Sequence, residues 1–281
     1  SVISVPGGDY RKQVQVMHDY RTTVLTALPS DAVRLAAELE QVQLGPRGLW
    51  LQVALLGGEP WPETVRAEIE ERLSVRAVDN YGVRVAAWPG FASECEARDG
   101  LHVNEDHFLA EIVAPETLQP LPPGSEGELV ITTLEKEALP VIRYRTGDTC
   151  AMLTEPCACG RTLARVTRPS RRTDETIVVR GISIQPEAIG RTVERVLGVS
   201  TERQIAVGER SYDDVEVRVA VPAQQADTER GLIELGRRRG DLERELAALL
   251  GLTVRVSIVE RSSLEGPQGS PRAVVDMRGR A

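Results

Sequence analysis

Lysine is almost absent from this chain of 281 residues, which contains Lys12 and Lys136 and takes the rest of its positive side-chain charge from arginine. Lysine and arginine together number 34 against 42 acidic residues, which gives a formal charge of -8. This balance disfavours nucleic acid and anionic membranes as main partners. Small molecules or proteins are the partners to expect.

The chain also lacks a long apolar run and a charged-then-apolar leader. Neither a membrane span nor a signal peptide is therefore predicted, and we expect a cytoplasmic protein. Cysteine is scarce as well, with Cys95, Cys150, Cys157 and Cys159. A chain of this length needs no disulfide staples, so thiols or metal ligands are the better interpretation.

The first half alternates β-rich runs with amphipathic helical patterns, which is typical of parallel strands with helices packed on the sheet. The pattern predicts strands at 2–5, 23–28 and 51–56, helices that begin near Asp9, Ser30 and Pro62, and a fourth strand that ends at Asp79. Ligands bind at the carboxyl ends of such strands. The loops after Leu56 and Asp79 are therefore the places to search.

From about residue 90 to 170 short strands with turn signals predict a β-rich subdomain, with separate strands at VIRYR and CAMLT. Residues 1–171 then form the first domain. The polar stretch at 169–175 serves as a linker, and residues 172–281 predict a small, mobile α+β domain.

Three thiols and one imidazole have spacing suited to a metal, namely Cys95, His102 and the C-x-C pair of Cys157 and Cys159. Such a ligand set suits tetrahedral zinc in a closed, structural site. His107 is the alternative imidazole. The other interpretation is that the C-x-C cysteines are surface thiols and that both histidines lie at strand edges. Cys150 falls in a strand pattern and is expected to be a buried hydrophobe.

Several longer motifs carry a family resemblance, and they follow one another in order along nearly the whole chain. They are GGEPW at 57–61, DGLHVNEDHF at 99–108, GELVITTLEKEALPVIRYRTGD at 127–148, PCACGRT at 156–162 and RTDETIVVRGISIQP at 172–186. The sequence resembles the phenylacetate–coenzyme A ligase branch of the adenylate-forming enzymes. The resemblance implies an α/β adenylate-forming fold that lacks its N-terminal part, because the family's phosphate loop lies upstream of the position that matches Ser1.

The resemblance also assigns candidate site residues. Those of the nucleotide site are Gly58, Glu59, Pro60, Tyr81, Gly82, Asp148 and Arg172. Arg172 with Asp174 also matches the hinge region. Asp31 and Trp88 match positions of the acyl pocket, and Arg180 with Gly181 matches the loop that lines the coenzyme A tunnel. A ring face suits the adenine, and a carboxylate suits both ribose hydroxyls.

The departures from the family concern the phosphate end of the reaction. Val85 stands where the family has a glutamate that supports magnesium, and a valine cannot ligate a hard cation. Ser270 fills the slot of the adenylation lysine, and Arg272 close by is no equivalent of a lysine point charge. The use of magnesium and ATP is therefore doubtful.

Three functional hypotheses follow. The first is a degenerate family member that binds an aryl acyl acid, adenylate or thioester between its domains and has lost ordinary ligation. The second is an aryl acid–coenzyme A ligase whose phosphate-loop part is on another chain or was omitted. The third is a non-catalytic, zinc-containing structural or interaction protein. A homodimer is a further partner to consider.

Overall fold

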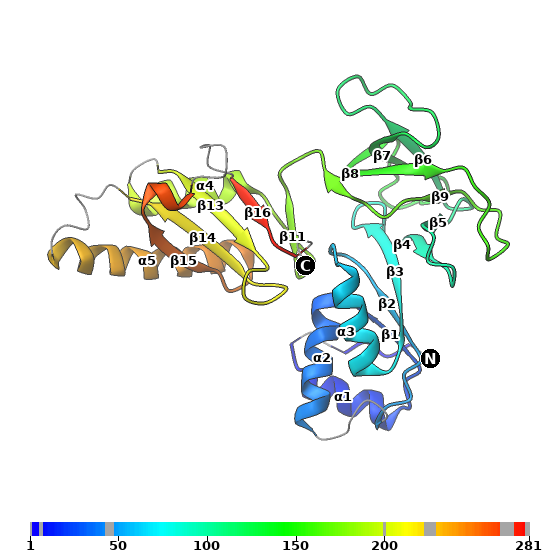
Figure 1. Cartoon of the computed structure of the whole chain (residues 1–281), viewed down its shortest axis with the longest axis horizontal. Helices are drawn as coiled ribbons and strands as arrows, with labels where there is room; N and C mark the ends of the chain where they lie inside the picture. Colours follow the sequence, from blue (N-terminus) through cyan, green and yellow to red (C-terminus); the bar gives the residue numbers. More distant parts are fainter. Residues whose placement is uncertain are drawn as a thin grey trace. The chain divides into compact units, whose positions relative to one another are not determined.

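A computed structural model describes residues 2–5, 8–42, 48–198, 201–221, 229–264 and 273–278, apart from the side chains of Trp88, Pro89 and residues 229, 230 and 232. The chain divides into two compact units, Ser1–Asp174 and Glu175–Ala281 (Figure 1). Among the described helices, none has the length and apolar character needed to cross a membrane.

The first unit begins with the predicted alternation of helices and parallel strands. Its elements are α1 (Tyr10–Asp19), β1 (Val24–Ala27), α2 (Pro29–Gln41), β2 (Val53–Leu56), α3 (Glu63–Leu73) and β3 (Arg76–Val83). β2 pairs in parallel with β1 on one side and with β3 on the other. The helices lie together on one face of these strands (Figure 1). Ala54 and Leu56, which are fully buried, alternate along β2 with the half-buried Val53 and Leu55.

The helices α1 and α2 each begin where a carboxylate accepts a hydrogen bond from an amide group of the first turn. Asp9 caps α1, since its carboxylate accepts from the backbone N–H of Lys12 at 2.9 Å. The cap predicted at Ser30 is wrong, because α2 begins with Pro29 in its first turn and Ser30 lies inside the helix. The backbone N–H of Ser30 donates instead to Oε1 of Glu59 at 2.7 Å. A carboxylate from the loop after β2 therefore caps this helix.

Three strand predictions are also corrected. Residues 2–5 form no strand, and Val2 is almost fully exposed. β3 does not end at Asp79 but runs to Val83, because its second half pairs antiparallel with the next strand. The two strands predicted at VIRYR and CAMLT are one, β8 (Tyr144–Leu153). Gly147 adopts a φ of +77° within it, next to a register shift, so a turn-like Gly-Asp pair sits inside a strand.

The β-rich part of the first unit extends the same sheet. Its other strands are β4 (Ala87–Glu94), β5 (Leu101–Val103), β6 (Phe108–Val113), β7 (Glu126–Thr133), β9 (Arg165–Val166) and β10 (Arg171–Arg172). In the described residues they join β1–β3 and β8 in a ten-stranded sheet of order β1-β2-β3-β4-β5-β9-β8-β7-β6, with β10 paired to β8. Phe91, Leu101, Leu129 and Ile131 are fully buried in its core.

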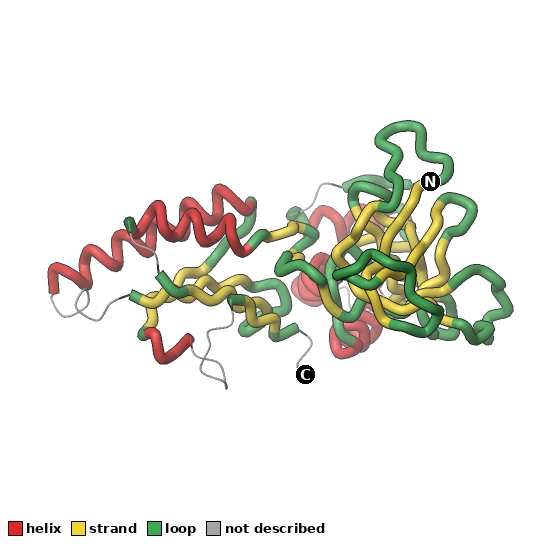
Figure 2. Tube along the Cα trace, turned by 90° about the horizontal axis from the view of Figure 1, so that it is seen from above, coloured by secondary structure: helices red, strands yellow, loops and turns green. Residues whose placement is uncertain are grey.

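The second unit is the expected α+β arrangement (Figure 2). It contains β11 (Ile177–Val179), β12 (Ile182–Ile184), α4 (Pro186–Leu197), β13 (Arg203–Val207), β14 (Val215–Ala220), α5 (Glu229–Leu250), β15 (Arg255–Val259), the 3-10 helix η3 (Arg261–Leu264) and β16 (Val274–Asp276). Four strands pair in the order β15-β14-β13-β16. Sequence patterns did not predict β12 and β16, which are only three residues long.

An ion pair buried in the first unit joins its helical and β-rich parts. Arg66 in α3 donates from both terminal nitrogens to the carboxylate of Glu94, at 2.8 Å each, and also to the carbonyl of Ala77. The two charged side chains are 2% and 3% exposed. Glu94 Oε2 also accepts from the backbone N–H of Asp79 at 2.9 Å. Every partner is therefore hydrogen-bonded, as a buried charge requires.

We expect Arg66→Met to lower the free energy of unfolding of the first unit by about 3–5 kcal/mol, because Glu94 would stay buried without its cation. All three tryptophans, Trp50, Trp61 and Trp88, belong to this unit. Urea unfolding followed by tryptophan fluorescence therefore reports on it selectively. Arg76→Met is the matched control, because Arg76 pairs with Glu96 at the surface and should cost less than about 1 kcal/mol. Equal, small losses in both variants would contradict this assignment.

Candidate functional site

The loop after β2 holds the first candidate nucleotide residues. Gly57 lies against β3 so closely that a Cβ atom would sit 1.9 Å from the carbonyl oxygen of Asn80. Gly58 follows with a φ of +85°, which suits glycine. Glu59 is buried and caps α2. This loop is thus fixed by packing and by a helix cap.

Tyr81 and Asp148 lie together with Arg172, although they are far apart in sequence. The Tyr81 hydroxyl donates to Asp148 Oδ2 at 2.6 Å, and an Arg172 terminal nitrogen donates to Asp148 Oδ1 at 2.7 Å. Arg172 also donates to both carboxylate oxygens of Asp174, at 2.6 and 3.0 Å, and to the carbonyl of Thr146. The pairing of β10 with β8 sets Arg172 opposite Asp148. The structure therefore brings three of the predicted nucleotide residues into one hydrogen-bonded chain.

Glycines make room for this chain of contacts. A Cβ atom on Gly147 would lie 2.6 Å from a guanidinium nitrogen of Arg172, so a side chain there would displace the arginine. A Cβ atom on Gly82 would lie 2.3 Å from the carbonyl oxygen of Ala87 across the β3–β4 turn. Both glycines thus permit close approaches that hold Tyr81 and Asp148 in place.

Burial dominates the electrostatics of this constellation. It raises the pKa of Asp148 above its usual value of 3.8, although the charge of Arg172 and the hydrogen bond from Tyr81 act in the opposite direction. Burial, followed by the charge of Asp148, raises the pKa of Tyr81 well above 10. Tyr81 is therefore a neutral donor at physiological pH.

The turn between β3 and β4 carries Val85, the residue in the magnesium-glutamate slot. The ammonium of Lys136 donates to the carbonyls of Val85 and Ala86 at 2.6 and 3.0 Å. Sequence reasoning missed this contact, although the rarity of lysine was a signal to examine Lys136. The turn therefore presents a hydrocarbon side chain and a neighbouring positive charge.

Asp31, an acyl-pocket candidate, has a hydrogen-bond partner outside this constellation. Asp31 lies in the first turn of α2 and accepts from the Tyr10 hydroxyl at 2.7 Å. Trp88 belongs to β4, but its side chain lies outside the described part of the chain, as do Ser270 and Arg272 entirely. Arg180 and Gly181, with φ of 51° and 69°, form the two-residue turn between β11 and β12.

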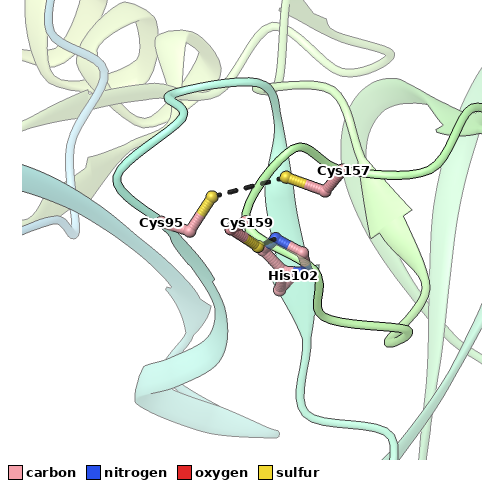
Figure 3. A group of neighbouring side chains, drawn as sticks. All are labelled: Cys95, His102, Cys157 and Cys159. Atoms are coloured by element: carbon pink, nitrogen blue, oxygen red, sulfur yellow. Dashed lines mark hydrogen bonds between the residues drawn. The ribbon is translucent and has the colours of Figure 1, made fainter.

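The predicted metal ligands meet in the β-rich part (Figure 3). Cys95 follows β4, His102 lies in β5, and Cys157 with Cys159 lies in the loop between β8 and β9. Their ligand atoms are all within 4.8 Å of one another. Cys159 is exposed and the other three are buried. The alternative imidazole, His107, is instead exposed beside Asp106 and Glu135.

The distances within this cluster fit a tetrahedral ion. The Sγ atoms of Cys95 and Cys157 are 3.5 Å apart, and the Sγ of Cys159 is 3.4 Å from Nε2 of His102. Zinc–sulfur bonds of about 2.3 Å at tetrahedral angles separate two sulfurs by about 3.8 Å, and a sulfur from an imidazole nitrogen by about 3.6 Å. A disulfide would need about 2.0 Å. The four side chains thus form a cluster that could bind a metal.

Backbone turns and burial prepare these ligands. Gly160, with a φ of +78°, closes the C-x-C turn, and its N–H donates to the carbonyl of Cys157 at 3.0 Å. Burial lowers the pKa of His102, which keeps its imidazole in the neutral, ligating form. A hydrogen bond from the backbone N–H of Arg161 lowers the pKa of Cys159, whereas burial raises that of Cys95.

Comparisons with known proteins support the resemblance that the sequence motifs indicate. A phenylacetate–coenzyme A ligase of Thermus thermophilus is 35% identical to this chain, and one of Escherichia coli is 36% identical. Both alignments cover 99% of this chain. The chain is a phenylacetate–coenzyme A ligase-like protein. In addition, residues 181–278 match the family described as AMP-binding enzyme C-terminal domain. The chain spans 65% and 63% of the length of these two relatives.

Solved structures confirm the predicted fold. A 2-hydroxyisobutyryl-CoA ligase in complex with 2-HIB-AMP and CoA has a TM-score of 0.81 at 24% identity, covering 97% of this chain and 58% of that chain. An amide bond synthetase from Marinactinospora thermotolerans has a TM-score of 0.65 at 18% identity, covering 96% of this chain and 54% of that chain. The α/β adenylate-forming fold is therefore shared at low sequence identity.

We expect Arg172→Gln to raise the pKa of Asp148 further, since the charge of Arg172 is the largest influence that lowers it, and Tyr81→Phe to raise it less. Carboxyl 13C NMR titration would measure both shifts. Because the folded-state pKa exceeds the unfolded value of 3.8, folded protein binds this proton more tightly. This carboxyl's contribution to stability therefore falls as pH rises from 3.8 through the folded-state pKa.

Arg143→Gln is the control for this titration, because Arg143 pairs with Glu111 at the surface of the same unit. It should leave the Asp148 resonance unchanged. An Asp148 pKa that does not respond to the loss of Arg172 would contradict the arrangement described here.

Proposed function

We propose that this protein binds an aryl acyl compound, as the acid, the adenylate or the thioester, and does not by itself carry out ordinary ATP-dependent ligation. The observation that carries the proposal is the turn at Val85. Family resemblance places the magnesium-supporting glutamate there, and the turn instead holds a valine whose carbonyl accepts from Lys136 at 2.6 Å.

This turn is poorly suited to a magnesium ion. Mg²⁺ requires oxygen ligands in near-octahedral geometry, and it uses one or two carboxylates to hold its place beside phosphates. Valine offers no oxygen from its side chain, and the lysine ammonium would repel a divalent cation. Adenylation depends on electrostatic stabilisation of the phosphates. A valine beside a lysine, in place of a glutamate, would therefore slow the chemical step.

The adenosine end of the site supports retained ligand binding. The Asp148 carboxylate has about four lone-pair positions, and Tyr81 and Arg172 each occupy one. The remaining lone-pair positions of Asp148 can accept hydrogen bonds from ribose hydroxyls, and Arg172 holds the carboxylate in a fixed orientation. These free acceptor positions fit an adenosine group, and the relatives named as phenylacetate–coenzyme A ligases favour an aryl acyl group beside it.

The Cys/His cluster supports a structural zinc ion. Thiolates and a neutral imidazole favour zinc over hard cations, and four protein ligands leave no open position for chemistry. The residues that would hold it are Cys95, His102, Cys157 and Cys159. Bound there, zinc would tie the end of β4 to the loop between β8 and β9.

A second candidate function is an aryl acid–coenzyme A ligase completed by a further polypeptide segment. One observation favours it. Val24 of the edge strand β1 is 49% exposed, and its partner in β2, Val53, is only half-buried, so one face of the parallel strands keeps apolar surface open within the described residues. Parallel sheets are usually covered on both faces. Ligase activity that appears only when such a segment is supplied would favour this candidate.

The purified protein should contain about one zinc ion per chain, measurable by elemental analysis of protein prepared without chelator. Cys157→Ser should remove the metal and lower the melting temperature of the first unit by about 10 °C, because a ligand present at a thousand times its dissociation constant adds about 4 kcal/mol to stability. The reducing conditions of the cytoplasm would keep these thiols available.

Cys150→Ala is the matched control for this measurement. Cys150 is buried in β8 but lies outside the cluster, so its loss should lower stability while leaving the metal content unchanged. Metal-free protein with freely reactive Cys157 and Cys159 would refute the zinc site.

AMP should bind about as tightly as ATP with magnesium, within about threefold, because the phosphates lack a magnesium ion held by the protein. Asp148→Ala should weaken both ligands about tenfold, through loss of hydrogen bonds to a charged group. Isothermal titration calorimetry measures both effects, and Asp106→Ala, which changes an exposed aspartate of the same unit, is the control.

Pyrophosphate exchange into ATP tests the chemical step directly. We expect no exchange above a no-enzyme control with aryl acids such as phenylacetate. Exchange catalysed by this chain alone, or binding of ATP with magnesium far tighter than that of AMP, would overturn the proposal in favour of an active ligase.

A further inference from the structure

Arg165 is a buried arginine beside the metal cluster to which neither the sequence patterns nor the family resemblance assigned a role. It lies in β9, directly opposite His102 of β5 in the strand register, and it is 3% exposed. A fully shielded guanidinium needs hydrogen-bond acceptors and a balancing charge. Its partners therefore indicate what it does.

The guanidinium contacts both loops that carry cysteine ligands. One terminal nitrogen donates to the backbone carbonyl of Asp99 and, at 2.8 Å, to Oδ2 of the same residue. The other terminal nitrogen donates to the backbone carbonyl of Glu155. Asp99 lies between Cys95 and His102, and Glu155 lies two residues before Cys157. The planar guanidinium of Arg165 thus joins the two segments that supply all four ligands.

Charge balance points to the same role. The carboxylate of Asp99 is 64% exposed and largely screened by solvent, so it balances a buried cation only in part. A divalent ion held by three thiolates and a neutral imidazole carries one net negative charge. The hydrogen bond to Asp99, above all, raises the pKa of Arg165. The metal–thiolate centre and the guanidinium would therefore offset each other's charge.

We propose that Arg165 is a positioning residue for the metal site: it holds the two cysteine loops at ligating distance and offsets the charge of the loaded cluster, so it raises metal affinity and slows metal release. This inference rests on the metal site proposed above. Arg165 would then affect both the affinity for the metal and the rate of its release without being one of the metal ligands.

Competition against a chromophoric chelator measures the inference. Wild-type protein, Arg165→Gln and Arg165→Lys would be stripped of metal and reloaded with Zn²⁺ for affinity and release rate, and with Co²⁺ for its absorption spectrum. Arg165→Gln should raise the zinc dissociation constant at least about tenfold, as loss of an outer partner of a metal ligand set does. Arg165→Lys should fall between, because an ammonium keeps the charge but cannot bridge both carbonyls as a planar fork does.

Two further variants separate the contributions. Asp99→Asn keeps the backbone acceptor and should change affinity less than Arg165→Gln. Arg76→Gln, which removes a surface arginine paired with Glu96 next to Cys95, should match the wild type. A purely structural role for Arg165 would lower the melting temperatures of metal-free and metal-loaded protein equally and leave the dissociation constant unchanged.

The outcomes are distinct. If wild-type protein takes up one metal per chain and Arg165→Gln binds it within twofold of the wild-type affinity, the inference is wrong and the metal site stands. If wild-type protein takes up no metal, the metal site itself is wrong. If Arg165→Gln does not fold, Arg165→Lys carries the test, and wild-type affinity and release rate in that variant would overturn the inference.

Discussion

The first unit depends on the buried pair of Arg66 and Glu94. Arg66 belongs to the helical part, and Glu94 is the last residue of β4, where the β-rich part begins. The same carboxylate accepts from the backbone of Asp79, at the point where β3 changes from a parallel to an antiparallel neighbour. One ion pair therefore fixes the junction at which a parallel sheet becomes an antiparallel one. Its cost in desolvation is offset only because each donor and acceptor has a partner.

Both candidate sites are built outward from that junction. Tyr81 lies two residues beyond Asp79, so the junction sets the position of its hydroxyl beside Asp148. Cys95 directly follows Glu94, so the first candidate metal ligand starts from the same fixed point. The chain then leaves Asp148 along β8, makes the loop of Cys157 and Cys159, and returns through β9 to Arg172 in β10. The metal cluster closes this loop, and the pairing of β10 with β8 completes it. The two sites are thus connected through the backbone that lies between them.

The sequence predicted the features that follow from hydrophobic periodicity or from the few residue types that bind zinc. It missed the features in which a side chain pairs with a residue that is distant in sequence. Val65, Ile69 and Leu73 show the spacing of a helix face, and the α3 helix follows. Zinc is held by a few residue types only, so the three thiols could be grouped from the sequence, with His102 or His107 as the imidazole. Arginine and glutamate are ordinarily surface residues, so nothing local marked Arg66, Glu94 or Arg165 as buried. The cap of α2 was misplaced for the same reason, since Glu59 reaches it from a loop beyond the next strand.

Residues that stabilise the fold are weak indicators of activity in this protein, because the fold alone can explain their presence. Glu59 caps a helix and Asp148 neutralises Arg172, so the fold has use for both whether or not a nucleotide binds. The turn of Val85 differs, because Lys136 contacts backbone carbonyls there and makes no contact that depends on the side chain at position 85. Nothing in the hydrogen bonding of that turn requires a hydrocarbon there. Under the proposed function, it is this position, more than the retained carboxylates, that sets the expectation for catalysis.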